Sequence, residues 1–247
     1  NDKTRLAYTS FNQFKNKLGI IFFAGHGSDM QGTKALALEK LTLENNIPFI
    51  KFDYYGHGES DGQLNKGNIS RWKSNSLEII QKVSVGPQII VGSSLGGWLM
   101  FLVAKELPEK IRGLIGIAAA PDFTENLIWE KLSLIQKKKL KQMKKIFVEN
   151  PYNNDPIEYT LDLIEDGKKN LILNKKINLN IPITLLHGME DKEVPWQTSI
   201  KITEKLVNND AKVTLVKCAN HRFSELEQIQ LIYNEVLLLY SKVNKIY

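Results

Sequence analysis

The sequence predicts an α/β fold, in which helices cover both faces of a doubly wound, mostly parallel sheet. Short β-rich runs alternate with helical patterns along the chain, as in open sheets built from strand, helix and strand units. Most of the later runs are continuously apolar, which is typical of strands covered on both faces. A chain of 247 residues, 43% of them hydrophobic, can bury one substantial core. We therefore expect a single domain over residues 1–247.

Seven β-rich runs are the predicted strands of this sheet. In chain order they are residues 5–11, 19–24, 48–54, 88–92, 113–118, 182–187 and 212–217. The segments with helical spacing of apolar residues are the predicted helices, at residues 33–45, 71–83, 97–105, 198–207 and 225–241. The long interval 122–180 interrupts the alternation with helical stretches of its own. We predict that it forms a helical cap, inserted over one edge of the sheet.

A lysine-dense segment, residues 130–147, carries much of the net charge of +6. Its apolar residues recur at roughly helical spacing, which predicts an amphipathic helix with a solvated lysine face. These residues are Leu132, Ile135, Leu140, Met143 and Ile146. Binding to nucleic acid or to an acidic membrane surface is the alternative. The chain has no zinc-finger spacing, glycine-rich phosphate loop or aromatic-basic RNA-binding signature, so we expect no nucleic-acid partner.

Cysteine usage and hydropathy predict the compartment. The single cysteine, Cys218, excludes an internal disulfide framework and a cysteine-rich zinc site, and it fits a reducing compartment. No apolar run approaches the ~18 to 20 residues that cross a bilayer, and the N-terminal residues lack a signal-peptide core. We expect a cytoplasmic protein without an integral membrane segment. The sequence does not predict the oligomeric state.

The motif Gly92-Ser93-Ser94-Leu95-Gly96 lies between a predicted strand and an apolar helix. In this context a G-x-S-x-G motif forms a sharp turn, the nucleophile elbow, that exposes its central serine. Small residues at positions 92 and 96 let the strand and the helix pack closely, and the central residue takes a strained backbone conformation. We predict that Ser94 is a nucleophile.

A serine nucleophile needs a histidine base and an acid, in the chain order serine, acid, histidine. His221 follows the last predicted strand, just before the final helix, so it is the predicted base. His187 ends a strand, and we expect it to be packed or hydrogen-bonded. His26 and His57 precede the serine, and we expect a structural role for His57.

The acid is expected after the preceding strand, where Glu190 and Asp191 are adjacent. Asp191 is favoured because a shorter side chain in a tight turn is more easily fixed. Glu190 is then a surface residue. The alternative acid is Asp122, which follows the predicted strand 113–118. Asp122 could instead be a helix cap or a turn residue at the entry to the insertion.

An acyl-transfer enzyme also needs hydrogen-bond donors for the oxyanion that forms on the attacked carbonyl. One predicted donor is the backbone N–H of Leu95, immediately after the nucleophile. The other is expected in the glycine-rich loop 23–30, where the backbone N–H of His26 is the predicted donor. The imidazole of His26 is then incidental to catalysis, or part of the pocket wall.

Over essentially its whole length the chain resembles the α/β hydrolases. The resemblance is carried by AGHGSDM, FDYYGHGES, GSSLGG, HGMEDKEVP and NHRF. The runs FAGHGSDMQGTKALALE, IAAAPDFTE and LIEDGKKNLIL are similar to the branch that contains a mitochondrial acyl-protein thioesterase, which also cleaves acyl-glucuronides, and its bacterial relatives. Where family members usually have Pro-Gly before the oxyanion donor, this chain has Ala24-Gly25. The resemblance implies that no metal and no organic cofactor takes part.

These residues predict a serine hydrolase that cleaves small-molecule esters or thioesters through an acyl-enzyme. Trp129 and Leu132 are three residues apart, which predicts one shared helix face in the insertion, continuing toward Ile128 and Ile135. This face either packs onto the sheet or lines the acyl pocket. Two alternatives remain: hydrolysis of another acyl bond, such as an amide, peptide or C–C bond, and binding of a small molecule without turnover.

Overall fold

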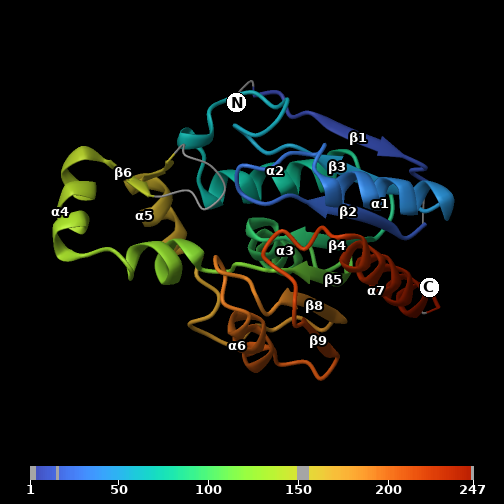
Figure 1. The fold of residues 1–247 in the computed structure, drawn as a ribbon. Coiled ribbons are helices and arrows are strands. Elements are labelled where there is room, and N and C mark those ends of the chain that lie inside the picture. Colours follow the sequence, from blue (N-terminus) through green and yellow to red (C-terminus); the bar gives the residue numbers. More distant parts are fainter. Residues whose placement is uncertain (1–3, 15–16, 149–155, 246–247) are drawn as a thin grey trace.

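The computed structural model describes residues 4–14, 17–148 and 156–245. Seven strands form one sheet in the order β1-β3-β2-β4-β5-β8-β9 (Figure 1). Their bounds are β1 Tyr8–Phe11, β2 Gly19–Phe23, β3 Phe49–Phe52, β4 Gln88–Ser93, β5 Ile111–Ile117, β8 Ile183–Gly188 and β9 Ala211–Val216. β1 runs antiparallel to β3, and the other neighbouring strands are parallel. The predicted fold class is confirmed.

Helices cover both faces of this sheet, as predicted. They are α1 Thr33–Glu44, α2 Ile69–Lys82, α3 Leu95–Glu106, α6 Gln197–Lys205 and α7 Leu226–Asn244. α1 and α7 pack together on one face, and α2 and α3 pack together on the other (Figure 1). Every residue of β2, β3, β4 and β8 is consequently buried, which explains why these strands are mainly apolar. β9 forms one edge of the sheet and stays partly exposed.

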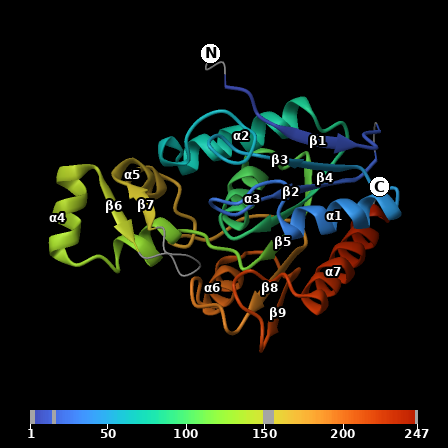
Figure 2. The same ribbon diagram turned by 45° about the horizontal axis from the view of Figure 1, so that its top comes forward.

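The chain between β5 and β8 builds a separate group of elements beyond the carboxyl ends of the parallel strands (Figure 2). They are a π-helical turn η2 (Thr124–Trp129), α4 (Leu134–Met143), β6 (Lys145–Val148), β7 (Ile157–Thr160) and α5 (Leu161–Lys169). α5 packs against η2 and α2. β6 and β7 form a second, antiparallel sheet, which the prediction of a helical cap did not include. Each strand is only four residues long, which is too short for a clear period-2 pattern.

The amphipathic helix predicted in the lysine-dense segment is present as α4, but it is shorter than the spacing of the apolar residues indicated. α4 begins at Leu134, after a capping box formed by Ser133, and it ends before Lys144, whose φ of 62° is left-handed. Such a residue stops a helix, so Ile146 lies on β6 instead. Among the described residues, no helix has the length and apolar character needed to span a bilayer.

Candidate active site

Ser94 occupies the turn between β4 and α3, at the carboxyl end of a central strand. Its φ of 52° and ψ of −113° are strained for a residue with a side chain. The turn is tight because two glycines allow close backbone contact. A Cβ atom on Gly92 would lie 2.4 Å from the carbonyl oxygen of Gly96, and one on Gly96 would lie 2.1 Å from that of Phe23. The sequence therefore specifies the strained turn that the motif predicts, with Ser94 partly exposed.

His221 and Asp191 come from two neighbouring loops, after β9 and β8, and they meet at Ser94. His221 Nε2 is 3.1 Å from Ser94 Oγ, and its Nδ1 is 2.7 Å from Asp191 Oδ2. In this arrangement Nδ1–H donates to the carboxylate, which leaves the lone pair of Nε2 to accept the serine proton. The structure thus brings the three predicted residues into one hydrogen-bonded chain.

Asp191 is buried and held on both carboxylate oxygens. Its Oδ1 accepts the backbone N–H groups of Glu193 and Val194 at 2.9 and 2.8 Å. Its Oδ2 accepts from His221 and from a second histidine, His187, whose Nε2 is 3.1 Å away. Burial raises the pKa of Asp191, but the hydrogen bonds from His187 and His221 outweigh it and hold that pKa well below its usual range. The carboxylate is therefore ionised at neutral pH.

His187 is fully buried, and the prediction that it is packed and hydrogen-bonded is confirmed. Its Nε2 faces two acceptors, Asp191 Oδ2 and the carbonyl oxygen of Val194, so this nitrogen carries the proton. Its Nδ1 then accepts from the hydroxyl of Ser199 at 2.8 Å. The contact with Asp191 was not predicted from the sequence.

Asp122, the alternative acid, has its carboxylate occupied elsewhere. Its two oxygens accept the backbone N–H groups of Ile172 and Leu173 at 2.9 and 2.8 Å. Its carbonyl oxygen accepts from two backbone N–H groups of the η2 turn, those of Glu125 and Asn126. Asp122 is thus a turn residue that ties the start of the inserted segment to its end, and the structure links Asp191 to His221. Glu190 is exposed, as predicted.

The loop after β2 approaches the serine closely. A Cβ atom on Gly25 would lie 3.4 Å from Ser94 Cβ. Among the described residues, the backbone N–H groups of His26 and Leu95 have no hydrogen-bond acceptor. Both N–H groups are therefore free to donate to a bound molecule, which is one requirement for an oxyanion hole.

Side chains of the loop after β3 hold the glycine-rich loop 23–30 in place. The buried carboxylate of Asp53 accepts the backbone N–H of Met30 at 2.7 Å. His57 Nε2 accepts the backbone N–H of Gly27 at 3.1 Å, and its Nδ1 lies 3.2 Å from the carbonyl oxygen of Tyr55. The structural role expected for His57 is confirmed, because its neutral ring bridges the two loops.

The imidazole of His26 packs among aromatic rings and not against Ser94. Its ring centroid lies 5.4 to 6.2 Å from the rings of His57, Trp72, Phe123 and Tyr159. Burial lowers the pKa of His26 to about 3, and the neighbouring His57 adds to the effect. The neutral ring forms part of the cleft wall.

A cleft of about 1450 Å³ opens above Ser94 and His221. On one side its walls are apolar and come largely from the inserted segment, including Leu127, Ile128 and Leu132. The side near His221 carries charged groups, among them Lys34, Lys192, Glu193 and Arg222. A cleft that combines an apolar wall with polar groups beside Ser94 can bind an organic substrate and orient it.

Comparisons with known proteins agree with the observed fold and identify a family. The sequence profile of the family described as "Serine aminopeptidase, S33" matches residues 15–165. The Bos taurus protein named palmitoyl-protein thioesterase ABHD10, mitochondrial, is 38% identical over 99% of this chain and 79% of its own length. The solved structure of mouse alpha/beta hydrolase domain-containing protein 10 has a TM-score of 0.90 and 36% identity, covering 98% of this chain and 96% of the mouse chain. The chain belongs to the α/β-hydrolase family.

A bacterial member of the family is equally similar in structure. A putative hydrolase from Agrobacterium vitis has a TM-score of 0.93 and 32% identity to this hydrolase, over 97% of this chain and 94% of the other. The predicted resemblance to a thioesterase branch with bacterial relatives is confirmed. The bovine relative is named as mitochondrial, and a cytoplasmic location for this hydrolase stays a prediction.

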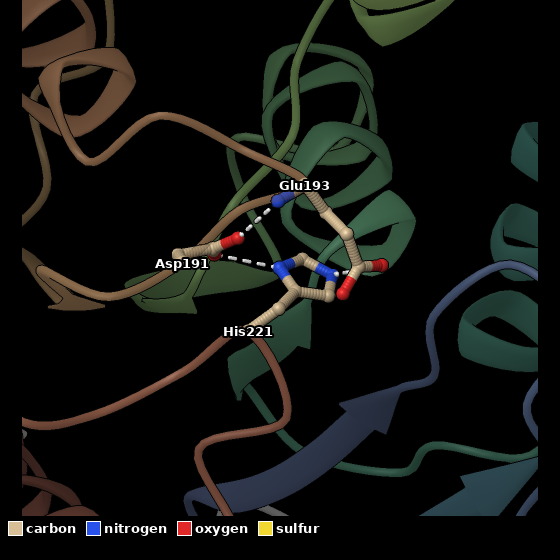
Figure 3. Close-up of side chains that lie close together, drawn as sticks. All are labelled: Asp191, Glu193 and His221. Carbon is tan, nitrogen blue, oxygen red and sulfur yellow. Dashed lines mark hydrogen bonds and ion pairs between the residues drawn. The ribbon is translucent and has the colours of Figure 1, made fainter. Parts of the chain in front are cut away.

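Glu193 is a residue of the site that sequence reasoning missed. Its Oε2 lies 3.9 Å from His221 Nε2, on the side of the ring that faces Ser94 (Figure 3). Burial raises the pKa of Glu193, and the nearby His221 and Arg222 offset only part of the increase. Nothing in the sequence indicated this contact beyond the position of Glu193 two residues after the acid.

Among the described residues, one group of side chains has ligand atoms close enough to bind a metal ion jointly. One ligand atom each from Asp191, Glu193 and His221 lies within 4.8 Å of the others. However, Asp191 Oδ2 and His221 Nδ1 already form a 2.7 Å hydrogen bond (Figure 3). A metal bound by all three side chains would have to break that bond. These residues therefore fit a proton-transfer chain better than a metal site, and the absence of a metal or cofactor from the reaction stays a prediction.

The predicted pair Trp129 and Leu132 does not share a helix face. η2 ends at Trp129 and α4 begins at Leu134, so Leu132 lies between two helices. Leu132 is nearly buried and lines the cleft, as does Ile128. The cleft lining does not include Trp129. Ile135, predicted on the same face, is 81% exposed.

Lysine side chains cover the indole ring of Trp129 outside the cleft. The ammonium groups of Lys137, Lys141 and Lys168 lie 5.1, 5.7 and 4.3 Å from its ring centre, within the range of cation–π contacts. The prediction of a shared face was wrong because the chain does not form an unbroken helix between residues 129 and 135.

Proposed function

We propose that this hydrolase cleaves carboxylic esters or thioesters in two steps through Ser94, His221 and Asp191. The observation that carries the proposal is the hydrogen-bonded chain from Ser94 Oγ through His221 to Asp191 at the floor of the cleft. A protein that only binds a small molecule has no use for this chain of groups. Labelling with a fluorophosphonate probe, which requires an activated serine, tests the proposal, and a protein that stays unlabelled would contradict it.

The residues would act as follows. His221 Nε2 takes the proton of Ser94 as Oγ attacks the carbonyl carbon, and the N–H groups of His26 and Leu95 stabilise the oxyanion. The tetrahedral intermediate then expels the alcohol or thiol, which takes the proton from His221. Asp191 holds the ring and stabilises its charged form during each transfer. Water releases the acid from the acyl-enzyme in the second step.

The substrate class follows from the cleft walls and from the relatives. The apolar side chains of the inserted segment suit a long hydrocarbon acyl chain, and the bovine relative is named a palmitoyl-protein thioesterase. We propose that residues 122–180 act as a cap whose inner surface binds the acyl chain. Peptide hydrolysis is the second candidate, because the matching family profile carries the name of an aminopeptidase.

Substituting Leu132 with alanine should change the preference for acyl chain length. The shorter side chain enlarges the apolar part of the cleft, so kcat/KM should rise for longer acyl groups relative to short ones. Each methylene newly accommodated is worth about 1 kcal/mol or somewhat more, which is at least about five-fold in rate. The measurement is a chain-length series of p-nitrophenyl and acyl-CoA esters. Ratios between substrates are unaffected if the variant is less stable, because the concentration of active enzyme cancels.

Trp129→Ala is the matched control for this experiment. It removes a larger side chain from the same segment, but one that does not line the cleft. The chain-length profile of this variant should equal that of the wild type. If Trp129→Ala shifts the profile and Leu132→Ala does not, the acyl chain lies elsewhere in the inserted segment.

Glu193 is placed to orient the water of the second step. Its carboxylate is too far from His221 Nε2 for a direct hydrogen bond, at 3.9 Å, but a water molecule that bridges the two groups fits this span. Such a water donates one hydrogen to Nε2 and one to Glu193. Its oxygen is then free to attack the acyl group on Ser94.

Glu193→Ala should therefore slow deacylation by about 10- to 100-fold, less than the ~10²- to 10⁴-fold of a group that transfers the proton itself, because Glu193 only positions the water. Acylation should change little, so p-nitrophenyl esters should give a burst of nitrophenol followed by slow turnover, and acylated protein should accumulate in intact mass spectra. Hydroxylamine, a stronger nucleophile than water, should restore turnover. Glu190→Gln changes an exposed carboxylate of the same loop and should show no burst. Equal slowing of both steps would contradict the assignment.

A further inference from the structure

The outer surface of α4 and β6 exposes large apolar side chains. Leu134 is 84% exposed, Ile135 81%, Met143 59% and Phe147 54%. Single exposed apolar residues are common, but these four lie within one short segment. α4 is at the end of the molecule farthest from the main sheet (Figures 1 and 2), so these side chains are accessible to a large partner.

Lysines alternate with these apolar residues on the same side of α4. Lys138 follows Leu134 by four residues and Lys139 follows Ile135 by four, which places each pair one helical turn apart. All four side chains are exposed, whereas Leu140, on the other side of the helix, is fully buried. We call Leu134, Ile135, Lys138 and Lys139 the outer face of α4.

The charged residues within this segment are all positive. Residues 133–148 contain Lys137, Lys138, Lys139, Lys141, Lys144 and Lys145, with no aspartate or glutamate. Lys145 pairs with Glu158 on β7, and two of the others contact the Trp129 ring. Lys138 and Lys139 remain on the outer face, so this face presents positive charge and exposed hydrocarbon together.

An anionic lipid bilayer matches both properties of this face. Lysines near such a surface are attracted to the lipid headgroups, and apolar side chains between them can enter the boundary with the acyl chains. A nucleic acid would bind the lysines but would not bury Leu134 and Ile135. We propose that the outer face of α4 docks this hydrolase on anionic membranes.

Docking through the outer face of α4 would bring the cleft close to the bilayer. Gln136 on α4 and Phe147 and Val148 on β6 line the cleft, and Phe147 is also exposed beside the lysines. An acyl chain could then pass from the membrane into the cleft along β6. Membrane binding itself does not depend on the proposed function, so the two proposals can fail separately.

The test is co-sedimentation with vesicles at about 150 mM salt, comparing pure phosphatidylcholine with vesicles that contain about 30 mol% phosphatidylglycerol. We expect binding to the anionic vesicles only. Lys138→Gln and Lys139→Gln should each weaken it about five-fold, the factor that corresponds to about 1 kcal/mol per lysine. Leu134→Ser combined with Ile135→Ser should weaken it at least about ten-fold. None of the four side chains lines the cleft, so hydrolysis of a water-soluble ester should be unchanged.

Leu43→Ser and Lys40→Gln on α1 are the matched controls, since both residues are exposed on a helix of the main sheet. These variants should bind vesicles like the wild type, and thermal melts of all variants should confirm that they fold. Absence of binding to anionic vesicles, or binding that the serine substitutions leave unchanged, would overturn the proposal. Tighter binding to double-stranded DNA than to vesicles, insensitive to the serine substitutions, would assign the face to nucleic acid instead.

Discussion

Replacing Ser94 with alanine is expected to lower kcat for esters by about 10³-fold or more and to abolish labelling by a fluorophosphonate. Only the nucleophilic oxygen is removed, and alanine tolerates the strained backbone at this position as well as serine does. The fold should therefore be retained, with a melting temperature near that of the wild type. Hydrolysis of p-nitrophenyl esters, intact mass after labelling and a thermal melt are the measurements.

Ser93→Ala is the control for this substitution. Ser93 precedes the nucleophile and also lines the cleft, but its side chain has no hydrogen bond to His221. This variant should keep its labelling and most of its activity. A Ser94→Ala protein that still hydrolyses esters near the wild-type rate would end the interpretation of this turn as a nucleophile elbow.

The central strands of the main sheet could be predicted because they are buried on both faces. Runs rich in buried apolar residues, such as those in Gln88–Ser93 and Ile183–Gly188, are typical of covered parallel strands, and each predicted strand agrees with the structure to within three residues at either end. The inserted segment lacked such runs. Its helix boundary depends on one left-handed residue, Lys144, which no sequence period marks.

The location of the site was predictable for a similar reason. Ser94, Asp191 and His221 each follow a different strand, and the carboxyl ends of parallel strands meet at one edge of the sheet. Side-chain directions within the loops were not predictable. The contacts of His187 with Asp191 and of Glu193 with His221 depend on how the loop after β8 turns, and residue spacing does not determine that turn.

Asp191→Asn is expected to lower kcat by about 10³- to 10⁴-fold, in line with the loss seen when the acid of such a triad becomes an amide. The carboxylate oxygen Oδ2 accepts from two histidine nitrogens, and the amide group cannot accept on both of its atoms. If the NH2 group faces His221, Nδ1 must become the acceptor. Nε2 then carries the proton and cannot take another from Ser94.

Asp122→Asn should have the opposite profile, with little change in kcat and a clear loss of stability. Its oxygens accept two buried backbone N–H groups, and an asparagine can accept only one of them with its single oxygen. The second N–H would face the amide NH2, at a cost of about 1 to 3 kcal/mol for an unsatisfied buried donor. Kinetics and thermal melts of both variants, measured together, show which carboxylate contributes to kcat and which to stability. A large loss of kcat in Asp122→Asn with near-normal activity in Asp191→Asn would place the acid after β5 and not after β8.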